Sequence, residues 1–141
     1  MSSKEEILGR VSIFADLKPK DLKKLAKDAH EVTFAAGTHL TDHDQFGATF
    51  FIVAEGSVDV SVNGVAVRNL GVGSYFGEMA LIDRETRSAT VIAKTDLKCL
   101  VLTRPAFRPF AYAHPEVAWA LLEAMVGRVR EAEQARADLS V

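Results

Sequence analysis

Residues 58–67 decide the fold and read Val-Asp-Val-Ser-Val-Asn-Gly-Val-Ala-Val. Valines alternate with other residues on both sides of Asn63-Gly64, and this alternation is typical of half-buried β-strands. Asn-Gly is the dipeptide that most favours the left-handed turn of a two-residue hairpin loop. The stretch therefore predicts two antiparallel strands joined at Asn63 and Gly64.

The length of the loop also predicts the register of this hairpin. Residues at equal distance from a two-residue loop lie opposite one another, and successive pairs point to opposite faces of the sheet. We expect valine pairs on the buried face and a pair of opposite charges on the other face. The expected pairs are Val62 with Val65, Val60 with Val67, and Asp59 with Arg68.

Further strand-like segments surround the hairpin. From about residue 30 the helical spacing of apolar residues gives way to alternation interrupted by turn residues, and we expect strands at residues 31–34, 49–54, 88–93 and 97–103. Short, evenly spaced strands of this kind are typical of antiparallel sandwiches and barrels. We predict a mainly β fold, an antiparallel and jelly-roll-like β-barrel over residues 31–104.

Helices are expected before the barrel. Ser3 and Glu6 have the spacing of a capping box that opens a short helix. Pro19 suits the first position of a second helix, in which Leu22 and Leu25 belong to one apolar stripe. The lysines beside this stripe are interrupted by acidic residues and indicate a solvated helix face.

Two more helices are expected after the barrel, because Pro105 and Pro115 each suit a first helical turn. In the longer helix, residues of one stripe recur alternately four and three positions apart, which is the spacing of a coiled-coil seam. The stripe packs either on the chain's own barrel or on a second copy through residues 117–139, as a homodimer. Its members are Ala118, Leu122, Met125, Val129, Ala132, Arg136 and Leu139.

The composition is that of an ordinary globular domain. The chain has 141 residues, 48% hydrophobic and 26% charged, with a formal net charge of -2, so it has no basic field for non-specific binding of nucleic acid or lipid. Cys99 is the only cysteine, which favours a reducing cytoplasm, and no secretion signal or membrane span is expected. We expect one domain over residues 1–141, with helices at 1–30, the barrel at 31–104 and helices at 105–139.

Residues 71–91 interrupt the strand pattern. Three glycines lie close together and a short apolar run without alternation follows them, so a loop and a short helix are expected. A glycine before a helical turn lets backbone N–H groups face an anion. Arg87 follows Glu78 by nine positions, and its planar donors can close on the same anion. The segment therefore predicts an anion-binding site.

This segment resembles the phosphate-binding cassette of cyclic-nucleotide-binding domains. The residues that carry the resemblance are Phe76-Gly-Glu-Met-Ala-Leu81 and, after a short linker, Arg87-Ser-Ala-Thr-Val91. The likeness extends over nearly the whole chain, from the N-terminal helices to the two C-terminal ones. The chain is identified as a member of this family, of the type found in the catabolite activator protein and in kinase regulatory subunits.

The resemblance implies a role for individual residues. Glu78 would accept a hydrogen bond from the ribose 2′-hydroxyl, Arg87 would pair with the cyclic phosphate, and Ser88 would bind the phosphate or a guanine amino group. The implied ligand is cyclic AMP, with cyclic GMP second, and no metal or catalytic residue is implied. The implied ligand-binding residues are Phe76, Gly77, Glu78, Met79, Ala80, Arg87, Ser88 and Ala89.

The resemblance implies a sensor and not an enzyme. The nucleotide would bind in the barrel, and the C-terminal helices would relay its presence to an effector. Reading DNA takes several more helices, so the effector would be a partner protein or a missing domain, with no direct contact of this chain with DNA or membrane. An alternative is the ligand domain of a truncated transcription regulator or channel.

The chain departs from the family pattern in two places. The residue before Arg87 is often proline in the family and is Thr86 here. Where the catabolite activator protein holds the base through hydroxyl side chains of its long helix, this chain has Ala132 and Glu133. The adenine contact is therefore not carried over, and Glu133 or Arg130 is the candidate replacement.

A cluster of possible metal ligands suggests another alternative. His39, Asp42, His43 and Asp44 fall in one predicted turn, and histidine and carboxylate groups together bind metal ions. A metal-dependent barrel enzyme would need further ligands from a distant strand, but residues 49–103 contain no histidine. We favour a solvated polar turn.

Overall fold

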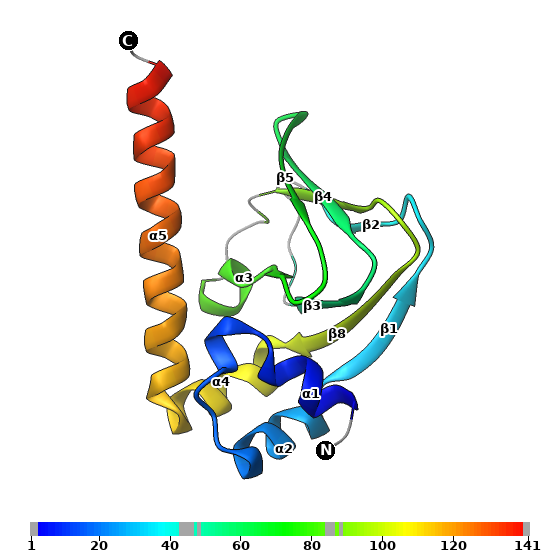
Figure 1. Cartoon of the computed structure of the whole chain (residues 1–141), viewed down its shortest axis with the longest axis vertical. Coiled ribbons are helices and arrows are strands. Elements are labelled where there is room, and N and C mark those ends of the chain that lie inside the picture. The colour runs from blue at the N-terminus through cyan, green and yellow to red at the C-terminus, as the bar shows by residue number, and fades with distance from the viewer. Residues whose placement is uncertain (1–2, 43–46, 48, 84–86, 88, 140–141) are drawn as a thin grey trace.

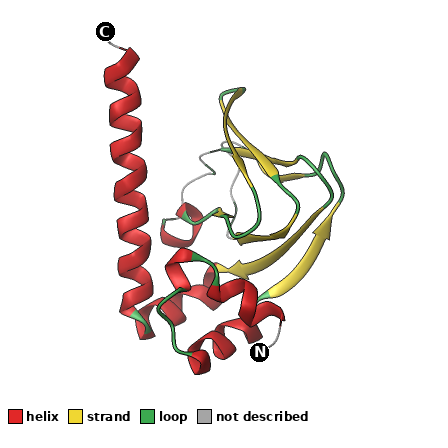
Figure 2. Ribbon diagram, in the orientation of Figure 1, coloured by secondary structure: helices red, strands yellow, loops and turns green. Residues whose placement is uncertain are grey.

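The structure is a computed structural model that describes residues 3–42, 47, 49–83, 87 and 89–139. Helices lie at both ends of a β-rich middle (Figure 2). The helices are α1 (Ser3–Gly9), the short 3-10 helix η1 (Ser12–Phe14), α2 (Pro19–Asp28), α3 (Met79–Ile82), α4 (Arg104–Ala113) and α5 (Pro115–Leu139). The strands are β1 (His30–Phe34), β2 (His39–Thr41), β3 (Thr49–Glu55), β4 (Val58–Val62), β5 (Val65–Leu70), β6 (Tyr75–Phe76), β7 (Thr90–Ala93) and β8 (Leu97–Thr103).

The strands form two four-stranded sheets, with the orders β1-β8-β3-β6 and β2-β7-β4-β5. Every recorded strand pair is antiparallel. Figure 1 shows the sheets curving around a common interior, with α1, α2 and α4 gathered at one end and α5 standing along one side. The predicted fold class, a mainly β jelly-roll-like barrel with helices before and after it, is confirmed.

The turn of the β4–β5 hairpin is as predicted, but the register beyond it is not. Asn63 and Gly64 have positive φ angles of 52° and 79°, and Val62 lies opposite Val65 as predicted. Val65 is 63% exposed, however, so its predicted place on a buried face is wrong. The register then shifts, so that Val60 lies opposite Arg68. The two other predicted pairs, Val60 with Val67 and Asp59 with Arg68, are therefore wrong.

The physical reason is a β-bulge in β5. Ser61 lies opposite Ala66 and Val60 opposite Arg68, so Val67 is an extra residue without a partner in β4. A bulge shifts the face to which all following side chains point. Val67 is accordingly 50% exposed instead of buried, and Arg68 takes its place on the face that Val60 occupies.

Strand β3 joins two apolar clusters because both of its faces are covered. Phe50 and Ile52 belong to the cluster beneath the N-terminal and C-terminal helices, whereas Phe51 and Val53 belong to the cluster inside the barrel. This division follows from the period of two along a strand. The ring of Phe50 lies edge-on to that of Tyr75, with 5.4 Å between the ring centroids, within the first of these clusters.

The predicted apolar stripe of α2 packs into the helix-side cluster. Leu22 and Leu25 are buried and the lysines of α2 are exposed. Asp21 of α2 is buried as well, and its Oδ1 lies 3.8 Å from Nε2 of His114, between α4 and α5. This contact holds α2 against the junction of the two C-terminal helices.

Helix α5 packs on the chain through two buried residues next to the predicted seam and through Met125 of the seam itself. Val117 and Leu121 are buried in the helix-side cluster, whereas Leu122 and Val129 of the seam are more than half exposed. Pairing of α5 with a second copy stays a prediction. Within the described ranges, no helix is long and apolar enough to span a membrane.

The observed register predicts how two valines of the hairpin differ in importance. Val58→Ala removes methyl groups from a fully buried side chain and should lower the free energy of unfolding by about 2 kcal/mol. Val67→Ala, at the bulge, should change it by less than about 0.5 kcal/mol. Urea unfolding of both variants measures the difference, and equal losses would contradict the bulged register.

Candidate ligand-binding site

A cavity of about 360 Å³ opens between the barrel and α5. Its volume lies in the range of small-molecule sites. Its walls come from β2, β4, β5, β6, β7, the loop into α3, and one face of α5. The described residues that line it are Thr41, Val60, Arg68, Leu70, Tyr75, Phe76, Gly77, Glu78, Met79, Arg87, Ala89, Val91, Met125, Arg128, Val129 and Ala132.

Gly77 lets the loop before α3 turn tightly at the wall of the cavity. Its φ angle is +85°, and a Cβ atom built there would lie 2.6 Å from the carbonyl oxygen of Thr49 and 2.9 Å from Nη1 of Arg87. Both the left-handed backbone and the lack of space demand glycine. The preceding Phe76 stacks on Phe51 at 4.8 Å between ring centroids, which fixes the loop to the barrel interior.

Arg87 is a buried cation, and its partners among the described residues are backbone carbonyls. Its side chain is 8% exposed, and it donates to the carbonyl oxygens of Thr49 at 3.0 Å and Gly77 at 3.4 Å. Burial, followed by the nearby charge of Arg104, lowers the pKa of Arg87. Among the described residues no carboxylate pairs with it, so its charge is poised for an anion in the cavity.

Gly47 is a second glycine that this site requires, and the sequence analysis did not identify it. A Cβ atom at this position would lie 2.5 Å from Nε and 2.8 Å from Cζ of Arg87. A side chain at position 47 would therefore displace the guanidinium. No local pattern marks this glycine, because the contact joins residues forty positions apart.

Glu78 and Arg128 form an ion pair across the cavity. Glu78 is 4% exposed and precedes α3, while Arg128 comes from α5, and the two side chains are in contact. The guanidinium of Arg128 also lies over the ring of Tyr75, 5.6 Å from its centroid, a cation–π contact. Burial and then the charge of Arg68 lower the pKa of Arg128.

Arg128 is a site residue that the sequence analysis missed. The signal was present, since Leu121, Met125, Arg128 and Ala132 follow one another at helical spacing of four, three and four, and a basic residue on an otherwise apolar or small stripe is unusual. The suggested base contacts, Arg130 and Glu133, are exposed and do not line the cavity.

Most of the predicted site residues do converge on the cavity. Those that line it are Phe76, Gly77, Glu78, Met79, Arg87 and Ala89. Ser88 and the side chain of Ala80 lie outside the described residues. The motif residues therefore lie on one wall of the cavity, and their role in binding stays a prediction.

The comparison with known proteins agrees with this geometry. The family model described as "Cyclic nucleotide-binding domain" matches residues 31–114, which is more than half of the chain. The chain belongs to the cyclic nucleotide-binding domain family.

Three relatives illustrate its place among cyclic nucleotide-binding domains. A cAMP-dependent protein kinase regulatory subunit of Aspergillus niger is 34% identical over 74% of this chain and 26% of the relative. The Thermus thermophilus catabolite activator protein superposes with a TM-score of 0.84 at 28% identity, covering 92% of this chain and 63% of that one. The regulatory domain of Toxoplasma gondii PKA with cAMP has a TM-score of 0.77 at 27% identity, covering 86% and 48%. The chain thus spans about a quarter of the length of the curated kinase subunit that it matches.

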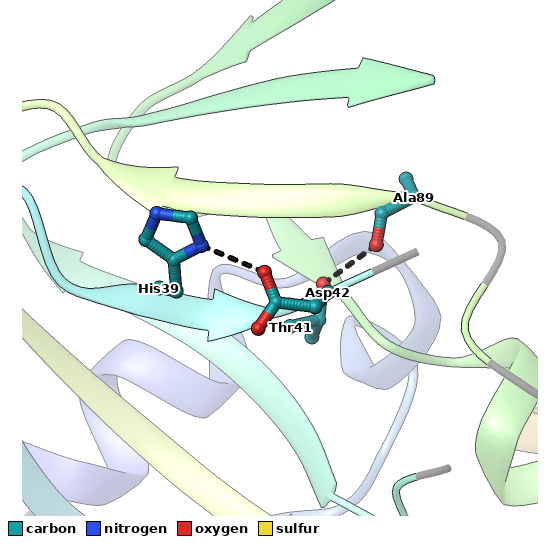
Figure 3. Close-up of polar contacts among 4 residues, drawn as sticks. All are labelled: His39, Thr41, Asp42 and Ala89. Carbon is teal, nitrogen blue, oxygen red and sulfur yellow. Dashed lines mark hydrogen bonds and ion pairs between the residues drawn. The ribbon is translucent and has the colours of Figure 1, made fainter. Parts of the chain in front are cut away.

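Two of the possible metal ligands of this cyclic nucleotide-binding domain contact each other. Nδ1 of His39 lies 2.7 Å from Oδ1 of Asp42, and both side chains are about half exposed. Figure 3 shows this pair beside the hydroxyl of Thr41, which donates to the carbonyl oxygen of Ala89 at 2.9 Å. His43 and Asp44 lie outside the described residues, and within the described part no three such ligands are grouped around a possible metal site.

The crowding at Gly77 can be separated from its backbone strain. Gly77→Ala should lower the free energy of unfolding by about 3 kcal/mol, since it adds a clash to the cost of a positive φ. Gly64→Ala is the matched control, because Gly64 has a similar φ of +79° but no atom within 4 Å of the added methyl group; it should cost about 1 kcal/mol. Equal losses in urea unfolding would contradict the close approach at Gly77.

Proposed function

We propose that residues 1–141 form one cytoplasmic sensor domain that binds cyclic AMP or cyclic GMP in the cavity and relays its presence through α4 and α5. The observation that carries this proposal is the buried guanidinium of Arg87, which faces the cavity without a described carboxylate partner. A small ligand with one negative charge would complete the site.

The cyclic phosphate fits the end of the cavity at Arg87. The planar N–H donors of Arg87 can bind two oxygens of one phosphate group. The carbonyls of Thr49 and Gly77 hold the guanidinium in place. Because neither Gly47 nor Gly77 has a side chain, the anion can approach both the backbone and Arg87. A cyclic monophosphate carries one negative charge, which the guanidinium of Arg87 can balance.

The ribose fits beside the phosphate, at Glu78. A carboxylate accepts hydrogen bonds through two oxygens, so Glu78 can bind a sugar hydroxyl while it pairs with Arg128. The Toxoplasma domain with cAMP supports cyclic AMP as the first ligand to test. The proposed role is binding and not catalysis.

The effector of this sensor would lie outside the described domain. The relatives named above include a kinase regulatory subunit and a catabolite activator protein, and each is longer than this chain. We propose that the output is delivered either to a partner protein or to a further domain, as in a transcription regulator or channel. Either effector would respond to the position of α5.

The anion contact is tested by Arg87→Ala. A charge-assisted hydrogen bond contributes about 1.5 to 3 kcal/mol, so the variant should bind either nucleotide roughly ten- to hundredfold more weakly in calorimetric titration. Arg130→Ala removes an exposed arginine outside the cavity and serves as the matched control. Unchanged affinity of Arg87→Ala would mean that the phosphate lies elsewhere, and no heat with either nucleotide would refute the proposed function.

The relay is tested at Arg128, which joins the ribose-binding carboxylate to α5. A ligand moves a helix only if it binds more tightly at one position of that helix than at another. The ion pair between Glu78 and Arg128 is a described charged contact between the cavity wall and α5. In the intact domain, saturating nucleotide should change amide hydrogen exchange over residues 121–132. Arg128→Met should abolish this change at saturation.

The same exchange experiment on Arg130→Met controls for loss of charge from α5. Because Arg130 is exposed and outside the cavity, its variant should respond like the unaltered domain. An undiminished response in Arg128→Met would show that occupancy reaches α5 by another route.

A further inference from the structure

A β-bulge in β2 turns Thr41 toward the cavity. His39 lies opposite Ile92 and Thr41 opposite Val91, so Leu40 is the extra residue of this bulge. Residues that lie opposite one another in a sheet point to the same face, and Val91 lines the cavity. Thr41 accordingly lines the cavity as well, and it is 7% exposed. A buried hydroxyl therefore belongs to the cavity wall.

The hydroxyl of Thr41 binds the main chain beside it. It donates to the carbonyl oxygen of Ala89 at 2.9 Å (Figure 3). Because a carbonyl can only accept, this contact uses the single proton of the hydroxyl. Strand β2 ends at Thr41 and β7 begins at Thr90, so the side chain of Thr41 holds the residue that lies just before β7.

Ala89 follows Arg87, the cation proposed to bind the phosphate, by two positions. Arg87 itself lies ahead of β7, whose pairing with β4 begins at Thr90. The guanidinium of Arg87 is anchored by the carbonyls of Thr49 and Gly77, but these contacts do not fix the main chain from which the side chain extends. The hydrogen bond from Thr41 to Ala89 restrains that main chain.

Loss of the Thr41 hydroxyl would disturb this arrangement in a defined way. A half-buried carbonyl without a donor is unfavourable, because it has left water without gaining a partner. The peptide of Ala89 would turn until its oxygen reached another donor, and the main chain at Arg87 would move with it. A hydrogen bond weakens steeply with misalignment, so the guanidinium would bind an anion less well.

We propose that Thr41 is a positioning residue of the ligand site, which holds Ala89 so that Arg87 presents its guanidinium to the phosphate; this inference rests on the proposed function. Thr41 acts through Arg87, so the effect of its hydroxyl on affinity depends on the presence of that arginine. This dependence separates positioning from a merely structural role, because a loosened barrel would weaken binding whether or not the guanidinium is present.

Calorimetric titration of the whole chain, with whichever of cyclic AMP and cyclic GMP binds more tightly, compares three variants. Thr41→Val replaces the hydroxyl by a methyl group and should bind roughly three- to tenfold more weakly, the contribution of one net hydrogen bond. Thr41→Ser keeps the hydroxyl and should stay within about twofold of the unaltered domain. Thr38→Val is the matched control, because the Thr38 hydroxyl also donates to an alanine carbonyl, that of Ala35 at 2.7 Å, but outside the cavity.

A double-mutant cycle with Arg87→Ala identifies the residue through which Thr41 acts. If Thr41 positions Arg87, its hydroxyl contributes nothing to binding once the guanidinium is gone. Adding Thr41→Val to Arg87→Ala should therefore weaken binding by less than about twofold beyond the loss caused by Arg87→Ala alone. Thr41→Ala also removes the hydroxyl and should lose as much affinity as Thr41→Val, so the result does not depend on how valine packs.

The remaining outcomes are distinct from one another. Unchanged affinity in Thr41→Val, or an equal loss in Thr41→Ser or Thr38→Val, would overturn the role of the hydroxyl and leave the proposed function standing. A loss of the same size with and without Arg87 would show that Thr41 does not act through this arginine, and it would also overturn the proposal. If the unaltered domain bound neither nucleotide, the proposed function itself would fall. Circular dichroism of each variant, matched to the unaltered domain, verifies that weaker binding is not lost folding.

Discussion

The burial of one positive charge, the guanidinium of Arg87, is the constraint on which the site depends. Taking such a group out of water costs several kcal/mol unless its surroundings compensate. Two backbone carbonyls compensate in part, and they can do so only because Gly47 and Gly77 leave the space empty. The tight turn before α3 and the shape of the cavity wall both follow from this requirement.

The ion pair between Glu78 and Arg128 adds a second constraint of a different kind. Buried ion pairs contribute little net stability, because the cost of desolvation offsets their attraction, but breaking one is costly. The pair therefore fixes where α5 stands relative to the barrel more than it stabilises the fold. Tyr75 reinforces this position, since its ring lies between the aromatic core and Arg128.

Features of the fold that depend on local patterns could be predicted from the sequence. The alternation of valines around Asn63 and Gly64 gave the hairpin and its turn, and the glycine-rich segment with Arg87 led to the cavity wall. Features that depend on tertiary packing could not. The bulge at Val67 leaves no local signature, because regular pairing would suit the same valines equally well.

Arg128 and Gly47 could not be predicted as site residues for the same reason, because their roles depend on tertiary contacts. Arg128 reaches Glu78 only because α5 returns alongside the barrel, fifty positions later in the chain, and no spacing rule relates the two. Gly47 is needed only because Arg87 folds back upon it. In both cases the residue can be identified in the sequence, but the contact that makes it necessary forms only when the chain folds.

Helix α5 is packed at its base and exposed over its last described turns. Val117 is buried and His114 contacts Asp21 beside it, whereas every described residue from 129 onward is exposed (Figure 1). Arg128 lies about 16 Å along the helix from Val117, and Leu139 about 33 Å. A rigid tilt of the helix about the α4–α5 junction would therefore move its tip about twice as far as it moves Arg128.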